Sequence, residues 1–127
     1  MTVLTQGEIE AAILATSDAL EDLTRDHAVA ADRAAQAEAD YKLAYFRTFL
    51  AVKGQGVVLA DEDGVPVRFP KPTEKVAEAY ATTSAADLYV AYKLSAAAAD
   101  AAKQALFTRR ARLDSLRTLS ANVRSLT

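Results

Sequence analysis

Glycine and proline are absent from two long stretches of this sequence, and their absence is what most limits the folds available to it. No Gly or Pro lies between Gly7 and Gly54, and none follows Pro72. These are the residues that interrupt helices, whereas alanine, which dominates the apolar composition, is the best helix former. Alanine also buries little area per residue, so long Ala-rich helices need several partners. The sequence therefore predicts an all-α, oligomeric protein: long helices in a helical hairpin, with a small β-hairpin insert at about 57–69.

The first stretch opens with a helix-start signal. Thr5 and Glu8 match the capping box, so a helix should begin near Gln6. A heptad-like face follows in alternating steps of four and three: Ile9, Ile13, Thr16, Leu20, Leu23, His27, Ala30, Ala34, Ala37, Tyr41 and Ala44. A single helix to about Val52 would be roughly 70 Å long, far beyond the diameter of a compact domain. We therefore expect a break at residues 24–27 or earlier; the alternative is one rod within an oligomer.

Residues 54–72 separate the two helical stretches. Val57 and Leu59 on one arm, and Val65, Val67 and Phe69 on the other, flank an Asp63-Gly64 turn and predict the β-hairpin. Thr73, which follows Pro72, should cap a new helix. A second cap signal in residues 82–87 predicts a break or bend near Ser84, with a last helix over about 85–124.

Charge is unevenly distributed along what we expect to be one domain, residues 1–127. Residues 1–40 carry nine acids against two Arg, a net of −7, and residues 101–127 carry six Lys or Arg against one acid, a net of +5. We divide the domain into an acidic N-terminal helical segment (1–53), the insert (54–72) and a basic C-terminal helical segment (73–127). This asymmetry indicates either a site for a polyanion on the basic segment or two segments that pair with each other.

The basic residues of the last helix follow a regular spacing. Lys103, Arg110, Arg117 and Arg124 recur every seven residues, and two helical turns place them along one side, here called the basic stripe. Arg109 and Arg112 flank it. All six could neutralise phosphates, or they could pair with the acidic segment, and the residues alone leave both interpretations open.

Aromatic and basic residues are mixed near the end of the first stretch. Residues 41–50, YKLAYFRTFL, include Lys42, Tyr45, Phe46 and Arg47. Their aromatic rings could anchor this segment on the second helical stretch. Alternatively, aromatic faces beside cations could form a stacking platform for unpaired bases.

The sequence lacks the residues that most catalytic and metal-binding sites require. No cysteine is present, which excludes disulfide, thiol and zinc–thiolate chemistry. His27, the one histidine, lies on the heptad-like face, where a histidine is more often packed than catalytic, and the sequence offers no Ser/His/Asp or Cys/His arrangement. The carboxylates do not follow the calcium-loop pattern. We predict that the protein is not an enzyme and uses no metal or cofactor. The N-terminus does not match a secretory signal and no apolar run is long enough for a membrane span, so we expect a cytoplasmic protein.

From Tyr41 to about residue 120 the order of features resembles the UvsY family of bacteriophage recombination mediators. A helix with aromatics and cations comes first, followed by a Gly-containing insert. A helix start at Thr73-Glu74-Lys75, a turn at residues 84–87 and a Tyr-bearing helix, DLYVAYKLSAAAADAAKQALFTRRARLDSLR, complete the order. The basic residues here concentrate at 103–124 rather than in the first long helix, and the insert is a predicted β-hairpin; both depart from the family pattern.

The resemblance implies a protein of the host bacterial cytoplasm that binds single-stranded DNA, forms a ring-like homo-oligomer and helps to load a RecA-like recombinase onto DNA covered by single-strand-binding protein. We expect DNA contacts from Lys103, Arg109, Arg110, Arg112, Arg117 and Arg124, assisted by Lys42, Arg47, Tyr45 and Phe46. The expected oligomer interface comprises Ile9, Ile13, Leu20, Leu23, Leu106, Leu113 and Leu116. Two alternatives remain: an oligomeric helical scaffold or adaptor without nucleic acid, and a phage-encoded binder of a host protein.

Overall fold

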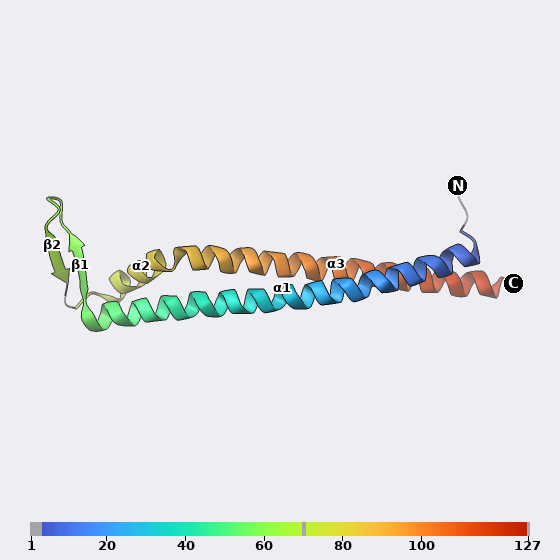
Figure 1. Ribbon diagram of the computed structural model, residues 1–127, viewed down its shortest axis with the longest axis horizontal. Helices are drawn as coiled ribbons and strands as arrows, with labels where there is room; N and C mark the ends of the chain where they lie inside the picture. Colours follow the sequence, from blue (N-terminus) through green and yellow to red (C-terminus); the bar gives the residue numbers. More distant parts are fainter. Residues whose placement is uncertain (1–3, 70, 127) are drawn as a thin grey trace. The chain divides into compact units, whose positions relative to one another are not determined.

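The computed structural model describes residues 4–69 and 71–126, and these residues form three helices and two short strands (Figure 1). Their order is α1 (Gln6–Gln55), β1 (Val57–Ala60), β2 (Pro66–Phe69), α2 (Glu74–Ser84) and α3 (Ala86–Ser125). The predicted, mostly helical fold is confirmed.

Two helices begin where the sequence signals indicated. At α1 the Glu8 backbone N–H donates to Thr5 Oγ1 and the Thr5 N–H donates to a Glu8 carboxylate oxygen, each over 3.2 Å. This reciprocal pair is the capping box, which satisfies N–H groups that have no partner within the helix. At α2, Thr73 Oγ1 accepts from the Val76 N–H over 3.3 Å.

The expected break in the first helix is wrong, because α1 is continuous from Gln6 to Gln55. Thr24, inside the suspected break, donates its hydroxyl to the Leu20 carbonyl over 2.7 Å, so its side chain is satisfied within the helix. No Gly or Pro interrupts the hydrogen bonds between Gly7 and Gly54, and Gly56 follows the last turn with a positive φ of 81°. α1 has packing partners in both units, so the diameter of a compact domain does not limit its length.

The predicted break near Ser84 is confirmed. Ala85 separates α2 from α3 with φ −99° and ψ 11°, and its N–H still donates to the Ala81 carbonyl over 2.9 Å. Ala77, Ala81 and Ala85 are all buried, at successive steps of four. The small side chains allow α2 to pack closely on its neighbours up to the point where the chain changes direction.

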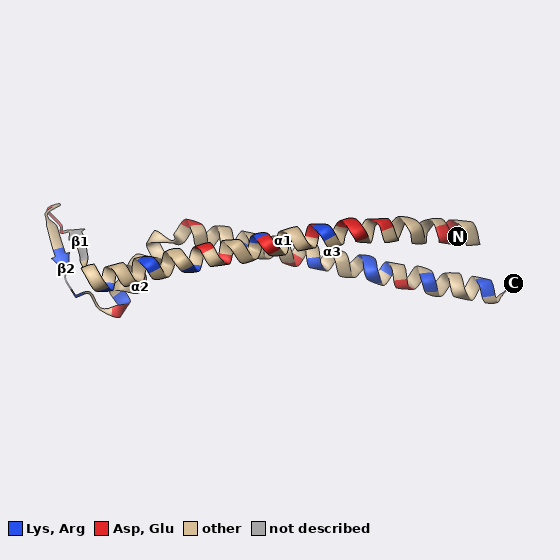
Figure 2. Cartoon of the chain, turned by 60° about the horizontal axis from the view of Figure 1, so that its bottom comes forward, with Lys and Arg blue, Asp and Glu red and all other residues tan. Residues whose placement is uncertain are grey.

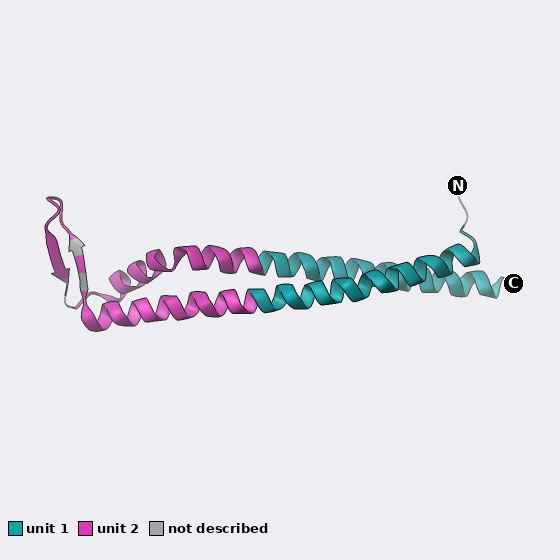
Figure 3. Ribbon diagram, in the orientation of Figure 1, with its two compact units in different colours: residues 1–33, 96–127 teal, residues 34–95 magenta. Residues whose placement is uncertain are grey.

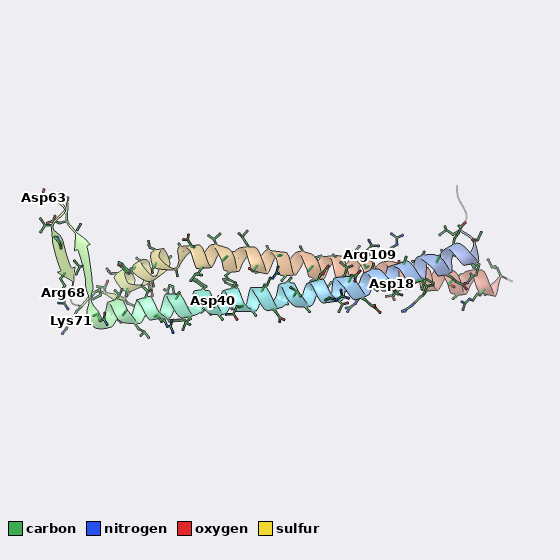
Figure 4. All side chains as sticks on the ribbon, viewed as in Figure 1. Asp18, Asp40, Asp63, Arg68, Lys71 and Arg109 are labelled. Atoms are coloured by element: carbon green, nitrogen blue, oxygen red, sulfur yellow. The ribbon has the colours of Figure 1, made fainter. Side chains whose placement is uncertain are left out.

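The insert between α1 and α2 contains two strands within the range predicted for a β-hairpin. β1 and β2 are antiparallel, with Val58 opposite Arg68 and Ala60 opposite Pro66. Asp61 organises the turn: its Oδ1 accepts from the backbone N–H groups of Asp63 and Val65, over 2.9 and 2.8 Å. Gly64 has φ 79°, a conformation that costs a side-chain-bearing residue free energy. Figure 4 labels Asp63 at the tip of this turn.

The chain divides into two compact units, shown in Figure 3. Unit 1 comprises Met1–Arg33 and Ala96–Thr127, and unit 2 comprises Ala34–Ser95. The acidic beginning and the basic end of the sequence thus belong to the same unit, and α1 and α3 each contribute to both.

In unit 1, α1 packs antiparallel on α3 with a narrow core. Ile9, Leu106 and Leu113 are buried, and so are Thr16 and Ser120. The amide nitrogen of Gln6 donates to Ser120 Oγ over 3.1 Å, which ties the first turn of α1 to α3.

In unit 2, α1 packs antiparallel on α2 and on the beginning of α3. Val52 and Ala77 are buried against each other, with Phe49 packed beside them. The hydroxyls of Thr48 and Ser84 lie 3.4 Å apart. Across both units, all eleven residues of the predicted heptad face on α1 are buried or half-buried.

Candidate nucleic-acid interface

The six cations predicted for the last helix all lie on α3 in unit 1, and all are exposed. Figure 2 shows blue bands along the C-terminal part of α3, and red bands on the N-terminal part of α1 beside it. The heptad spacing places the basic stripe next to Leu106 and Leu113, the buried leucines of α3. The cations therefore border the α1–α3 seam, and α3 holds them at fixed spacing.

Ion pairing engages few of these cations. Among residues 4–69 and 71–126, three salt bridges form: Asp22 with Arg25 at 3.6 Å, Glu38 with Lys42 at 2.7 Å and Glu10 with Arg124 at 3.3 Å. Only the last joins the acidic segment to the basic helix.

The four central arginines, Arg109, Arg110, Arg112 and Arg117, have no ion-pair partner in the described parts of the chain. Lys103 lies over the Phe107 ring of its own helix, 5.6 Å from the centroid. The hypothesis that the acidic segment neutralises the basic helix therefore holds for Arg124. The guanidinium groups of the four central arginines are exposed, and their N–H donors can bind a ligand.

Glu10 joins a small polar network at one end of unit 1. Its carboxylate accepts from the Gln6 amide over 3.1 Å and from the Arg124 guanidinium over 3.3 Å. The Gln6 hydrogen bond, followed by that of Arg124, lowers the pKa of Glu10 below its usual 4.5. Arg124 thus helps to fix the helix ends, a role different from that of the other cations.

A cavity of about 450 Å³ opens beside the seam of unit 1. α1 contributes Ala19, Asp22 and Leu23 to its wall, and α3 contributes Ala105, Thr108 and Arg109. The small side chains of Ala19 and Ala105 leave this space unfilled. Arg109, labelled in Figure 4, is exposed and lines this cavity, which an anionic group could approach.

Unit 2 gathers the aromatic residues of α1 and α3 into a second candidate surface. The Tyr41 ring lies 5.2 Å from that of Tyr89 and 5.9 Å from that of Tyr92, by centroids. Lys93 stands over both of the α3 rings, at 5.5 and 5.0 Å. Tyr89, Tyr92 and Lys93 are not among the site residues predicted from the sequence, although their spacing of three and four residues places them on one side of a helix.

The four α1 residues predicted to assist DNA binding have different surroundings. Tyr45 is half-buried among rings, 5.4 Å from Phe46 and 6.1 Å from Tyr41. Lys42 donates to Glu38 over 2.7 Å, and this hydrogen bond raises the pKa of the lysine. Phe46 is 56% exposed and Arg47 is exposed at the rim of a 510 Å³ cavity in unit 2. The Tyr41 ring thus packs on α3, as the first interpretation of this segment expects, whereas the ring contacts of Tyr45 lie within α1.

The residues predicted for an oligomer interface all lie on or beside the α1–α3 seam of unit 1. Three of them, Ile9, Leu106 and Leu113, are buried inside the chain itself. The others are half-buried: Ile13, Leu20, Leu23 and Leu116. Intramolecular packing therefore occupies much of the surface that the sequence assigned to subunit contacts, because the same heptad pattern serves a helix within the chain as well as one from another copy.

The described residues contain no side-chain group or helix typical of a metal site or a membrane span. No group of three or more His, Cys, Asp or Glu side chains in them is arranged to hold a metal ion. None of their helices is long and apolar enough to cross a membrane. His27 is half-buried on the α1 seam.

Comparison with known proteins identifies no relative. No protein-family model, curated protein or solved structure matches this chain.

Proposed function

We propose that the protein binds single-stranded DNA through the C-terminal part of α3. The observation that supports this most directly is the set of four exposed arginines at 109, 110, 112 and 117, which have no ion-pair partner among the described residues. Guanidinium groups bind phosphate oxygens with two parallel hydrogen bonds. α3 holds these donors at fixed positions, with Arg110 and Arg117 two turns apart on one side of the helix, where they can bind phosphates of one phosphodiester backbone.

The proposed biological role is that of a phage recombination accessory protein. In this role the protein assembles as a homo-oligomer in the host bacterial cytoplasm and helps to load a RecA-like recombinase onto DNA covered by single-strand-binding protein. The support is the order of features shared with the UvsY family from Tyr41 onward. In unit 2, the Tyr41, Tyr89 and Tyr92 rings with Lys93 offer aromatic faces and a cation of the kind on which unpaired bases stack.

DNA binding is tested by fluorescence anisotropy with a labelled poly-dT oligonucleotide, titrated from ~50 to ~200 mM salt and repeated with duplex. The test variant is Arg109→Ala/Arg110→Ala/Arg112→Ala/Arg117→Ala. Each phosphate contact on a single strand contributes about 0.7 to the slope of log K against log salt, so loss of four contacts should reduce the slope by about 2.8. A matched control removes the same charge elsewhere: Arg25→Ala/Arg33→Ala/Lys71→Ala/Lys75→Ala.

The proposal expects tighter binding to the single strand than to duplex, and a large loss in the test variant alone. Equal losses in the two variants would mean that net charge, rather than α3, determines binding. Absence of binding at ~50 mM salt by folded protein would overturn the proposal.

An oligomeric scaffold without nucleic acid is the second candidate function. Two observations in unit 1 favour a scaffold, because each brings opposite charges into one place. Glu10 pairs with Arg124, and Asp22 and Arg109 line the same cavity. In that case the anisotropy experiment shows no binding by the folded protein.

A further inference from the structure

A second apolar stripe runs along α1 on the side opposite its intramolecular seam. Ala39, Leu43, Phe46 and Leu50 follow one another in steps of four, three and four, which is a heptad pattern. Leu43 lies nine residues before the buried Val52, and Leu50 lies nine residues after the half-buried Tyr41. Nine residues are two and a half helical turns, so this outer stripe faces away from the packing within unit 2.

The outer stripe is exposed in spite of its composition. Leu43 is 52% exposed, Phe46 56% and Leu50 66%, and Ala39 is exposed as well. Three large apolar side chains in register on one helix face are more than the scattered single residues that ordinary surfaces carry. A helix with two opposite heptad faces can pack on two partners, of which the chain itself supplies one.

The charged residues beside the outer stripe favour one kind of partner. If Leu43 and Leu50 occupy position a, then Ala39 and Phe46 occupy d, Asp40 and Arg47 occupy e, and Lys42 occupies g. In an antiparallel pair of identical helices, e positions face e positions. Asp40 then lies beside Arg47 of the second copy, and the symmetry repeats the pair. The same alignment sets Leu43 against Phe46 and the small Ala39 against Leu50, so large and small side chains alternate.

Other arrangements lack this complementarity. In a parallel pair, g positions face e positions, which brings Lys42 against Arg47 of the second copy, two like charges. α3 also exposes Val90 and Leu94, by 54% and 67%. If Leu94 occupies position a and Val90 position d, then Ala91 occupies e and Lys93 occupies g. A parallel contact between the outer stripe and this α3 face then places Lys93 against Arg47, two like charges. An antiparallel contact places the uncharged Ala91 against Asp40 or Arg47, so no ion pair forms.

We propose that two copies of this chain associate through the outer stripe of α1, with the two helices antiparallel and Asp40 paired with Arg47 across the interface. Asp40, labelled in Figure 4, has its Oδ1 engaged by the Gln36 amide over 2.8 Å, which holds the carboxylate on the helix surface with further acceptor capacity for a guanidinium. This proposal uses none of the α3 arginines and does not rest on DNA binding. It assigns Phe46 and Arg47 to contact between copies.

Sedimentation velocity of the full chain without nucleic acid, over a series of concentrations, tests the proposal. The wild type should form dimers. Leu43→Ala/Leu50→Ala should sediment as a monomer with an unchanged far-ultraviolet circular dichroism spectrum, because both side chains lie outside the core. Leu94→Ala, which truncates an equally exposed leucine on α3, is the matched control and should dimerise like the wild type.

Charge reversal tests the antiparallel alignment. Asp40→Arg and Arg47→Asp each replace two attractive contacts by two repulsive ones and should weaken dimerisation by about tenfold. The double variant Asp40→Arg/Arg47→Asp restores opposite charges and should regain wild-type affinity. A monomeric wild type, or loss of dimers in Leu94→Ala but not in Leu43→Ala/Leu50→Ala, would overturn the outer stripe as the interface. Failure of the double reversal to recover affinity would overturn the antiparallel pairing.

Discussion

Truncation of Ile9 should destabilise unit 1 more than its position near the start of α1 implies. Ile9 is the largest side chain that is wholly buried in the described residues, with 0% exposure, and it follows the Thr5–Glu8 capping box by one residue. Ile9→Ala removes three buried carbon atoms, a loss of about 2.4 kcal/mol at about 0.8 kcal/mol per methylene. The remaining cavity adds to this loss, while the better helix propensity of alanine offsets about 0.4 kcal/mol. The expected net cost is about 2.5 kcal/mol.

Urea unfolding followed by circular dichroism measures this cost, at one protein concentration and neutral pH. For a chain of this length, a loss of about 2.5 kcal/mol also corresponds to a fall of about 10 °C in Tm. Leu14→Ala is the control, because Leu14 lies on the same helix with 68% exposure and should change stability by no more than about 0.5 kcal/mol. If Ile9→Ala costs no more than Leu14→Ala, the packing of the first turn of α1 on α3 is refuted.

Three further predictions concern α1, the turn of the insert and the polar network of unit 1. Ala28→Pro, in the exposed middle of the continuous helix, should cost about 3 kcal/mol or more and reduce ellipticity at 222 nm, whereas Ala28→Gly should cost about 1 kcal/mol; similar effects of the two would indicate a break in α1. Gly64→Ala should destabilise the turn by about 1–2 kcal/mol, seen as faster amide exchange of Val65, and Gly64→Asn should be milder; equal exchange in all three proteins would contradict the positive φ. The lowered pKa of Glu10 gives stability that is present above 4.5 and is lost as pH falls through the lowered value, so Glu10→Gln should flatten the fall in the urea midpoint below pH 4.5; an unchanged acid profile would show that the Gln6 and Arg124 contacts do not affect the carboxyl.

The features that the sequence predicted correctly depend on neighbouring residues. Thr5 with Glu8, and Thr73 before Glu74, each satisfy backbone N–H groups within one helical turn, so their effect can be seen in a short window. The heptad face of α1 also appears in sequence, because burial against any partner requires the same spacing. The break near Ser84 follows from a local cap signal.

The features that the sequence did not predict depend on which segments meet. Continuity of α1 through residues 24–27 was missed because we judged its length against a compact domain, and periodicity alone does not say how far a partner helix extends. Lys93 contacts Tyr89 and Tyr92 where Tyr41 packs on α3. The sequence of either helix alone does not indicate that Tyr41 packs at this point of α3. Arg124 differs from the other cations because its partner, Glu10, lies 114 positions away.

The contact between the beginning of α1 and the end of α3 has a consequence for synthesis on the ribosome. Gln6 and Ser120 meet across 114 positions, whereas Thr48 and Ser84 in unit 2 are 36 apart. A growing chain can therefore close unit 2 while α3 is still being made, and it must hold the acidic part of α1 without its basic neighbour until nearly all of α3 has emerged. The contact of Gln6 with Ser120 can form only after Ser120 has left the ribosome, so unit 1 should complete folding last. During that interval the side chains of Ile9 and of the leucines that follow it are exposed and can bind chaperones or other nascent chains.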